Sequence, residues 1–159
     1  MISVCNQREA KRDLPRLIDL KKRLHIPWIG VSMEPLLEPV SIREWVRELD
    51  WIIVGGESGR EARPMHPRWA AEIMRDCKAA GTAFFFKQWG EWLPEHEAPT
   101  DVYDELRRKG VETQQLPADP NYFAPVRLDN RTFFRAGKSG AGALLLGEER
   151  QAFPEALLS

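Results

Sequence analysis

Residues 51–90 have the sequence WIIVGGESGREARPMHPRWAAEIMRDCKAAGTAFFFKQWG, and their pattern indicates the fold class. The stretch has a short apolar run near each end, and neither run alternates strictly between apolar and polar side chains. Such runs are typical of strands covered on both faces. Between them, residues 67–80 start at a proline, stop before a glycine and predict a helix. Its apolar face has i, i+3, i+4, i+7 spacing and consists of Ala70, Ile73, Met74 and Cys77.

The same alternation of strand and helix extends toward the N-terminus. Two more apolar runs, residues 2–5 and 28–33, predict strands. Residues 8–24 between them have helical spacing, with Pro15 inside the pattern. A proline costs little in the first helical turn, where its missing N–H has no partner to lose. We therefore expect the firm part of this helix to begin near Asp13.

A further helix is predicted over residues 41–49, which open with Ser-Ile-Arg-Glu. This is a capping box, with Ser41 at the N-cap and Glu44 at the third helical position. With strands at 51–54 and 82–86, the order becomes β-α-β-α-β-α-β. Right-handed crossovers then give a parallel sheet, and the fold class is α/β.

The pattern changes after residue 92, so we expect three parts. Residues 1–92 form the βα core. Residues 93–131 contain five prolines and one helical candidate at 101–109, so they predict an irregular extension packed over the core. Residues 132–159 predict a C-terminal segment packed on the core. Within it, GKSGAG at 137–142 lacks the spacing of a phosphate-binding loop and predicts a turn.

Composition excludes several classes of protein. The 159 residues are 43% hydrophobic and 30% charged, with a net charge of −1. This hydrophobic content is enough to form the core of one folded domain. The balance of acidic and basic residues indicates no broad nucleic-acid-binding surface. We expect a cytoplasmic protein, because no run is long enough to span a membrane and no signal peptide is evident. Cys5 and Cys77 lie far apart and the three histidines are scattered, so no metal site is predicted on this chain.

Polar residues gather directly after the predicted strands, at the end where parallel α/β proteins carry their sites. Two carboxylates could accept hydrogen bonds from hydroxyl or amino groups, and a lysine and an arginine could neutralise an anion. Glycines could bring backbone N–H groups close to a ligand. A tryptophan could stack on a flat ring. The alternative is a network of mutual ion pairs, with the glycines serving only the turn. The candidate ligand-binding residues are Glu34, Gly55, Gly56, Glu57, Ser58, Arg63, Lys87, Gln88 and Trp89.

Five segments resemble a prophage-borne family of unknown function, named after phage gene products thirty-seven and sixty-eight. The three most specific are WIGVSMEPLLEPV, LDWIIVGGESGREARPMHPRW and AAGTAFFFKQWGEW. ISVCNQREAKRDLP near the start and FFRAGKSGAGALLLGEERQAFP near the end also resemble it. Two positions depart from the family pattern: Cys5 stands where the family usually has Glu, and Leu146 where it usually has Asp.

The resemblance implies a TIM-barrel-like fold. Members of that family usually carry an upstream segment with a three-cysteine motif similar to that of radical S-adenosylmethionine enzymes. This sequence lacks that motif, so the resemblance implies the C-terminal half of the barrel. The nine candidate residues named above match the family pattern. The resemblance implies no cofactor on this chain alone, and S-adenosylmethionine or an iron–sulfur cluster only if an upstream half is supplied.

Three functional interpretations remain open. The chain is half of a radical-SAM-like enzyme without autonomous catalysis, or a non-catalytic module that binds a nucleotide-like or anionic ligand or a protein partner, or a phage fragment without a selected function. A half barrel leaves open edges and an exposed apolar interior. We expect a homodimer to cover them, with a complementary half-barrel chain or residues 93–131 as alternatives.

Overall fold

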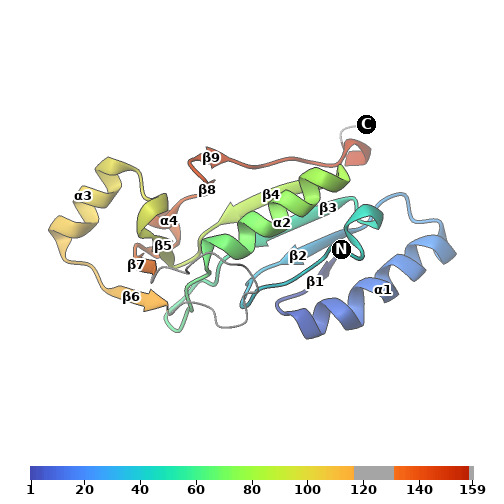
Figure 1. The fold of residues 1–159 in the computed structure, drawn as a ribbon, viewed down its shortest axis with the longest axis horizontal. Coiled ribbons are helices and arrows are strands. Elements are labelled where there is room, and N and C mark those ends of the chain that lie inside the picture. Colours follow the sequence, from blue (N-terminus) through green and yellow to red (C-terminus); the bar gives the residue numbers. More distant parts are fainter. Residues whose placement is uncertain (117–130, 158–159) are drawn as a thin grey trace, which may run out of the picture.

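Four parallel strands in sequence order form the main sheet of the computed structural model, which describes residues 1–116 and 131–157 (Figure 1). The four predicted strands and their parallel pairing are confirmed. The described residues form no closed barrel. The strands are β1 (Ile2–Ser3), β2 (Gly30–Met33), β3 (Trp51–Gly55) and β4 (Ala83–Gln88).

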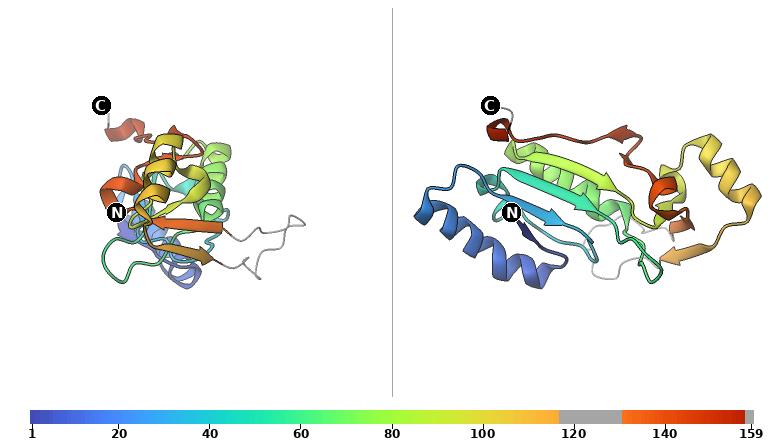
Figure 2. Two further views of the ribbon diagram at one scale, coloured as in Figure 1. Left: turned by 90° about the vertical axis from the view of Figure 1, so that its left-hand side faces the viewer. Right: turned by 180° about the vertical axis from the view of Figure 1, so that it is seen from behind.

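The two faces of this sheet differ. On one face, alternate strand residues such as Ile52, Val54 and Phe86 are fully buried in a core shared with helices α1 (Gln7–Leu24) and α2 (Pro67–Ala80). Residues of the other parity, which include Trp51, Ile53 and Phe85, stay partly exposed. Figure 2 shows the strands in front of α2 when the molecule is seen from behind. We call this side of the sheet, on which no helix of the described residues packs, the open face.

Helix α1 corrects the expected start. It begins at Gln7 instead of Asp13, so Pro15 lies in its interior. The side chain of Asn6 caps the first turn by accepting from the backbone N–H of Glu9 at 2.9 Å. Ala10, one turn before Asp13, is fully buried. The cap and this burial outweigh the hydrogen bond that Pro15 removes.

The predicted helix over 41–49 is wrong. Only a short 3-10 turn, η1 (Val46–Glu48), forms there. A capping box requires Glu44 to accept from the backbone N–H of Ser41. That N–H instead donates to Oε1 of Gln7 at 2.7 Å, and Nε2 of Gln7 donates to the carbonyl of Ser41 at 3.2 Å. A side chain from α1 therefore takes the place of the local cap.

The predicted helix over 67–80 is confirmed as α2. His66 caps it, because its Nδ1 accepts from the backbone N–H of Arg68 at 3.2 Å. Cys77 is fully buried on the core side of the helix, and burial raises the pKa of its thiol to about 12. No helix among the described residues is both long and apolar enough to cross a membrane.

The extension after residue 92 is more regular than expected. It contains β5 (Trp92–Pro94) and β6 (Thr113–Leu116), which flank β7 (Arg131–Arg135) in an antiparallel sheet. Between β5 and β6 lie η2 (Glu95–Glu97) and α3 (Thr100–Lys109), and α3 confirms the helical candidate. β7 pairs with β5 and β6, which lie far from it in the sequence. The local sequence, with its many prolines, therefore does not predict these strands. Residues 117–130 of the expected extension lie outside the described residues.

The glycine-rich run near the C-terminus forms a one-turn helix, α4 (Gly137–Ala141), where a turn was expected. Positive φ angles at Gly137 (72°) and Gly142 (68°) bracket it. A short hairpin follows, with strands β8 (Leu144–Leu145) and β9 (Glu148–Glu149). A final 3-10 turn, η3, covers Glu155–Leu157.

Residues 150–153, which we call the C-terminal strap, run along the outer edge of β4. The backbone N–H of Phe86 donates to the carbonyl of Arg150 at 2.6 Å, and the N–H of Ala152 donates to the carbonyl of Phe84 at 2.9 Å. The ring of Phe153 lies 5.4 Å from the ring of Phe85 and equally far from that of Trp51 on the open face. The strap thus closes one edge that a parallel sheet would leave unpaired.

Replacing Ala152 with proline removes the N–H that bonds to β4. We expect Ala152→Pro to lower the free energy of unfolding by about 1–3 kcal/mol more than Gln151→Pro, because Gln151 donates no backbone hydrogen bond to β4. Urea denaturation of both variants measures the difference. Equal losses would mean that the pairing of the strap with β4 does not stabilise the fold.

Candidate functional site

Charged side chains follow three neighbouring strands at one edge of the sheet. Glu34 comes directly after β2, Glu57 comes two residues after β3, and Lys87 is the second-last residue of β4. Because the strands are parallel, their carboxyl ends meet at this edge. The structure therefore brings together the charges that the sequence predicts.

The first ion pair crosses the middle strand. Nζ of Lys87 lies 2.8 Å from Oε2 of Glu34, and the hydroxyl of Ser32 donates to Oε1 of Glu34 at 3.2 Å. Between the two charged residues lies Gly55. A Cβ at Gly55 would stand 3.1 Å from Cγ and Oε2 of Glu34. The absence of a side chain at Gly55 thus leaves room for the carboxylate to reach Lys87.

The second ion pair belongs to the loop after β3. Arg63 donates to Glu57 from Nε and from Nη2, each at 2.8 Å, and also from its backbone N–H at 2.8 Å. Hydrogen bonding by the Arg63 side chain holds the pKa of the Glu57 carboxyl below its usual value. The carboxylate therefore stays charged well below neutral pH.

Both pairs place the carboxylate inside and the cation outside. The side chain of Glu34 is 17% exposed and that of Lys87 is 51% exposed. The corresponding fractions are 23% for Glu57 and 63% for Arg63. A molecule approaching this edge of the sheet consequently meets an ammonium and a guanidinium group, each held in place by a carboxylate behind it.

Gly56 and Gly90 allow two chain segments to pass each other at close distance. A Cβ at Gly56 would stand 1.9 Å from the carbonyl oxygen of Trp89, and one at Gly90 would stand 2.1 Å from the carbonyl oxygen of Glu57. The N–H of Gly56 donates to the carbonyl of Gln88 at 2.9 Å. This N–H is therefore occupied, which corrects the expectation that it faces a ligand.

Trp89 also differs from the expectation of a ring exposed for stacking. The residue is 1% exposed, its ring packs edge-to-face on Phe86, and its Nε1 donates to the carbonyl of Leu144 at 2.8 Å. Trp89 supports the site from the core side. Gln88 stays at the surface, where its Nε2 donates to the hydroxyl of Ser58 at 3.2 Å.

Two residues near the site were not predicted. Cys5 lies two residues after β1, and its backbone N–H donates to Oε2 of Glu9 at 2.7 Å. Burial raises the pKa of the Cys5 thiol, and the charges of Glu9, Arg63 and Glu57 also act on it. Cys5 thus stands within electrostatic reach of the second ion pair. Its place at the end of a predicted strand, residues 2–5, was the available signal.

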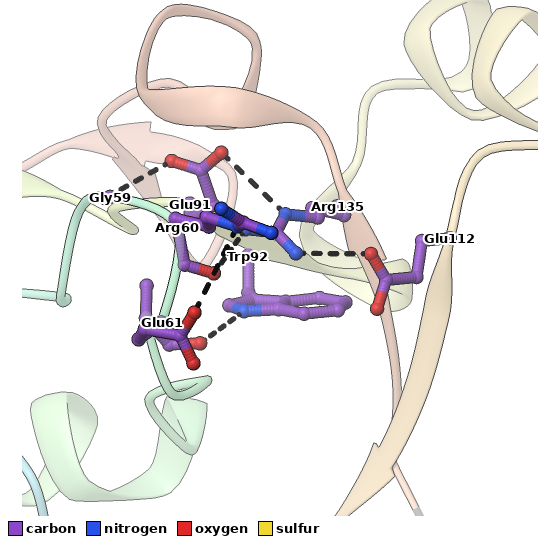
Figure 3. A network of polar contacts seen from close by, with 8 residues as sticks. Gly59, Arg60, Glu61, Glu91, Trp92, Glu112 and Arg135 are labelled. Carbon is purple, nitrogen blue, oxygen red and sulfur yellow. Dashed lines mark hydrogen bonds and ion pairs between the residues drawn. The ribbon is translucent and has the colours of Figure 1, made fainter.

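A network centred on Arg135 ties the loop after β3 to the antiparallel sheet (Figure 3). The guanidinium group donates to the carbonyl of Arg60 at 2.6 Å and to Glu112 at 3.0 Å, and it lies 5.4 Å from the ring centroid of Trp92. Nε1 of Trp92 donates to the carbonyl of Ala62 at 2.7 Å. These contacts hold the loop that carries Glu57 and Arg63. No local sequence signal marks Arg135, because it lies 75 residues from Arg60.

The described residues do not fit an iron–sulfur cluster. They contain no group of three or more cysteine, histidine or acidic side chains placed to hold a metal ion. The chain has two cysteines, of which Cys5 follows β1 and Cys77 is fully buried in α2. Cluster binding requires several thiolates on one site.

The fold and the strand-end charges define an α/β domain with an open parallel sheet and a candidate binding edge formed by two ion pairs, whose cations are the more exposed partners. The chain belongs to the family described as Protein of unknown function (DUF5131), which matches residues 1–154. No curated protein and no solved structure matches the chain. Membership in a family of unknown function is thereby confirmed.

Substitution of the adjacent glycines Gly55 and Gly56 with alanine should lower the free energy of unfolding by different amounts. In Gly56→Ala the new Cβ meets backbone atoms of Trp89, which cannot move aside cheaply, so we expect a loss of several kcal/mol, about 3 or more, or failure to fold. In Gly55→Ala the Cβ meets the flexible side chain of Glu34, so we expect a loss of about 1 kcal/mol or less. Urea denaturation measures both, and equal losses would contradict the close crossing.

Proposed function

We propose that this chain is a non-catalytic binding module that takes a ligand with a phosphate or carboxylate group at the strand ends. The exposed cations of the two ion pairs carry this proposal. The side chains of Lys87 and Arg63 are half or more exposed to solvent, while Glu34 and Glu57 fix them from the core side. Preorganised guanidinium and ammonium groups bind anions well, because little side-chain freedom is lost on binding.

The resemblance to the phage-derived family supports a finer proposal. In it, the chain is a phage-related protein corresponding to the C-terminal half of a radical-SAM-like barrel, and it has no autonomous catalysis. The cysteine content supports the second part, because an iron–sulfur cluster would have to be held by another half. S-adenosylmethionine has a carboxylate group that suits Lys87, so it is one of the ligands to test.

Isothermal titration tests the binding proposal. We expect the full chain to bind at least one of three probes: S-adenosylmethionine, ATP or inorganic phosphate. Lys87→Met removes one exposed cation and should weaken that binding at least tenfold. Lys109→Met is the matched control, because Lys109 is also about half exposed and also pairs with a glutamate, Glu105, but lies on α3.

The titrations have two outcomes that overturn the proposal. One is the absence of heat with all three probes. The other is an equal loss of affinity in Lys87→Met and Lys109→Met, which would mean that binding follows net charge instead of the strand-end site. Circular dichroism of both variants checks that each is folded.

The open face of the sheet favours a second role, assembly. We propose that a second copy of the chain packs on it, as the half-barrel interpretation implies. Parallel sheets are normally covered on both faces. Here the helices cover one face, and Trp51, Ile53 and Phe85 stay partly exposed on the other. A complementary half-barrel chain is the alternative partner.

Light scattering at micromolar concentration tests this assembly. We expect a mass of twice the 18.3 kDa of one chain. Ile53→Glu places a charge at the centre of the open face and should give a monomer, because a buried unpaired carboxylate is costly. Leu24→Glu is the control, since Leu24 is exposed at the end of α1. A monomeric parent chain would overturn the proposal.

A further inference from the structure

A hollow of about 520 Å³ lies between the second half of α2 and the C-terminal strap. Figure 1 shows the chain after β9 running alongside α2 and β4. The hollow is formed by Met74 and Lys78 of α2, Phe84 of β4, and strap residues that include Arg150 and Ala152. Its size lies in the range of small-molecule sites, about 300–1,000 Å³. We call it the α2 groove.

One wall of the α2 groove is apolar. Met74 and Phe84 line it, and Met74 is partly exposed although it lies on the apolar side of α2. Ala152 adds a small side chain from the strap. These residues suit an aliphatic body that lies between the helix and the strap.

Two cations stand beside this apolar wall. Lys78 lies one turn after Met74, on the same side of α2, and it has no ion pair among the described residues. Nη2 of Arg150 lies 2.8 Å from Oε2 of Glu148. Nε of Arg150 is buried and has no hydrogen-bond partner within residues 1–116 and 131–157. The carboxylate of Glu149 also lines the groove, so the lining has two cations and one anion.

The α2 groove continues into a larger hollow of about 770 Å³. Lys78, Thr82 and Ala152 line both spaces. The larger hollow extends past the C-terminal end of α2 to Leu49 and Phe153. The lining of the larger hollow includes the charged residues Arg47, Asp50 and Glu155, so the apolar wall for an aliphatic tail is that of the α2 groove itself.

We propose that the α2 groove binds a small amphipathic anion, an aliphatic chain that ends in a carboxylate. The carboxylate pairs with Lys78 and with the guanidinium group of Arg150, which is only partly satisfied by Glu148. The aliphatic chain lies against Met74 and Phe84. This site is formed by α2 and the strap, so it is independent of the strand-end ligand proposed above.

Titration with three matched probes tests the charge and the apolar body separately. Octanoate has both, acetate lacks the tail, and octylammonium has the tail with the opposite charge. We expect octanoate to bind at least tenfold more tightly than either of the others. Two-dimensional NMR of the labelled chain should show the largest amide shifts at Lys78, Thr82 and Gln151 on adding octanoate. Shifts concentrated at Gly55 and Lys87 would overturn the α2 groove and support the strand-end site.

Variants of the groove complete the test. Lys78→Met and Arg150→Met should each weaken octanoate binding at least fivefold, and Lys138→Met should leave it unchanged. Lys138 is the control because it is exposed on α4 and also lacks an ion pair within the described part of the chain. Equal binding of octanoate and octylammonium would overturn the proposal, as would equal effects of all three variants.

Discussion

Two backbone segments touch where β3 and β4 end, and the rest of the candidate site depends on that contact. Gly56 and Gly90 each face the backbone of the other segment at a distance that admits no Cβ. The hydrogen bonds from Gly56 to Gln88 and from Glu91 to Glu57, each 2.9 Å long, continue the pairing beyond the regular sheet. The loop that carries Glu57 is therefore held in a fixed position relative to the end of β4, which carries Lys87.

Charge placement follows from this geometry. Glu34 reaches Lys87 across Gly55, and Glu57 is held by three hydrogen bonds from Arg63. Ion pairs at a surface contribute little to stability, about 0–1 kcal/mol each, since water competes for both partners. Their effect here is mainly positional, because a carboxylate at the core side fixes where each cation meets solvent. Arg135 also has a positional effect, because it links the loop after β3 to the antiparallel sheet.

Much of the parallel sheet follows from local sequence pattern. Each of its strands is a short apolar run bounded by polar residues, glycine or proline, and α2 has a proline start, a glycine stop and a regular apolar face. The strand-end position of Glu34, Glu57 and Lys87 follows from that topology. Other features depend on contacts between distant residues. Gln7 accepts from the backbone N–H of Ser41 that a capping box would use, and the buried indole N–H of Trp89 finds its acceptor at Leu144, 55 residues later in the chain.

The C-terminal strap has a consequence for synthesis on the ribosome. Trp51 donates from Nε1 to the carbonyl of Ala152, a partner 101 residues later in the chain. At a synthesis rate of about 5–20 residues per second, the ribosome needs several seconds or more to make that partner. During this interval the edge of β4 and the aromatic residues beside it are uncovered in the nascent chain. The order of translation thus leaves an unpaired parallel edge open to chaperones, or to mispairing with a neighbouring nascent chain, before the strap arrives.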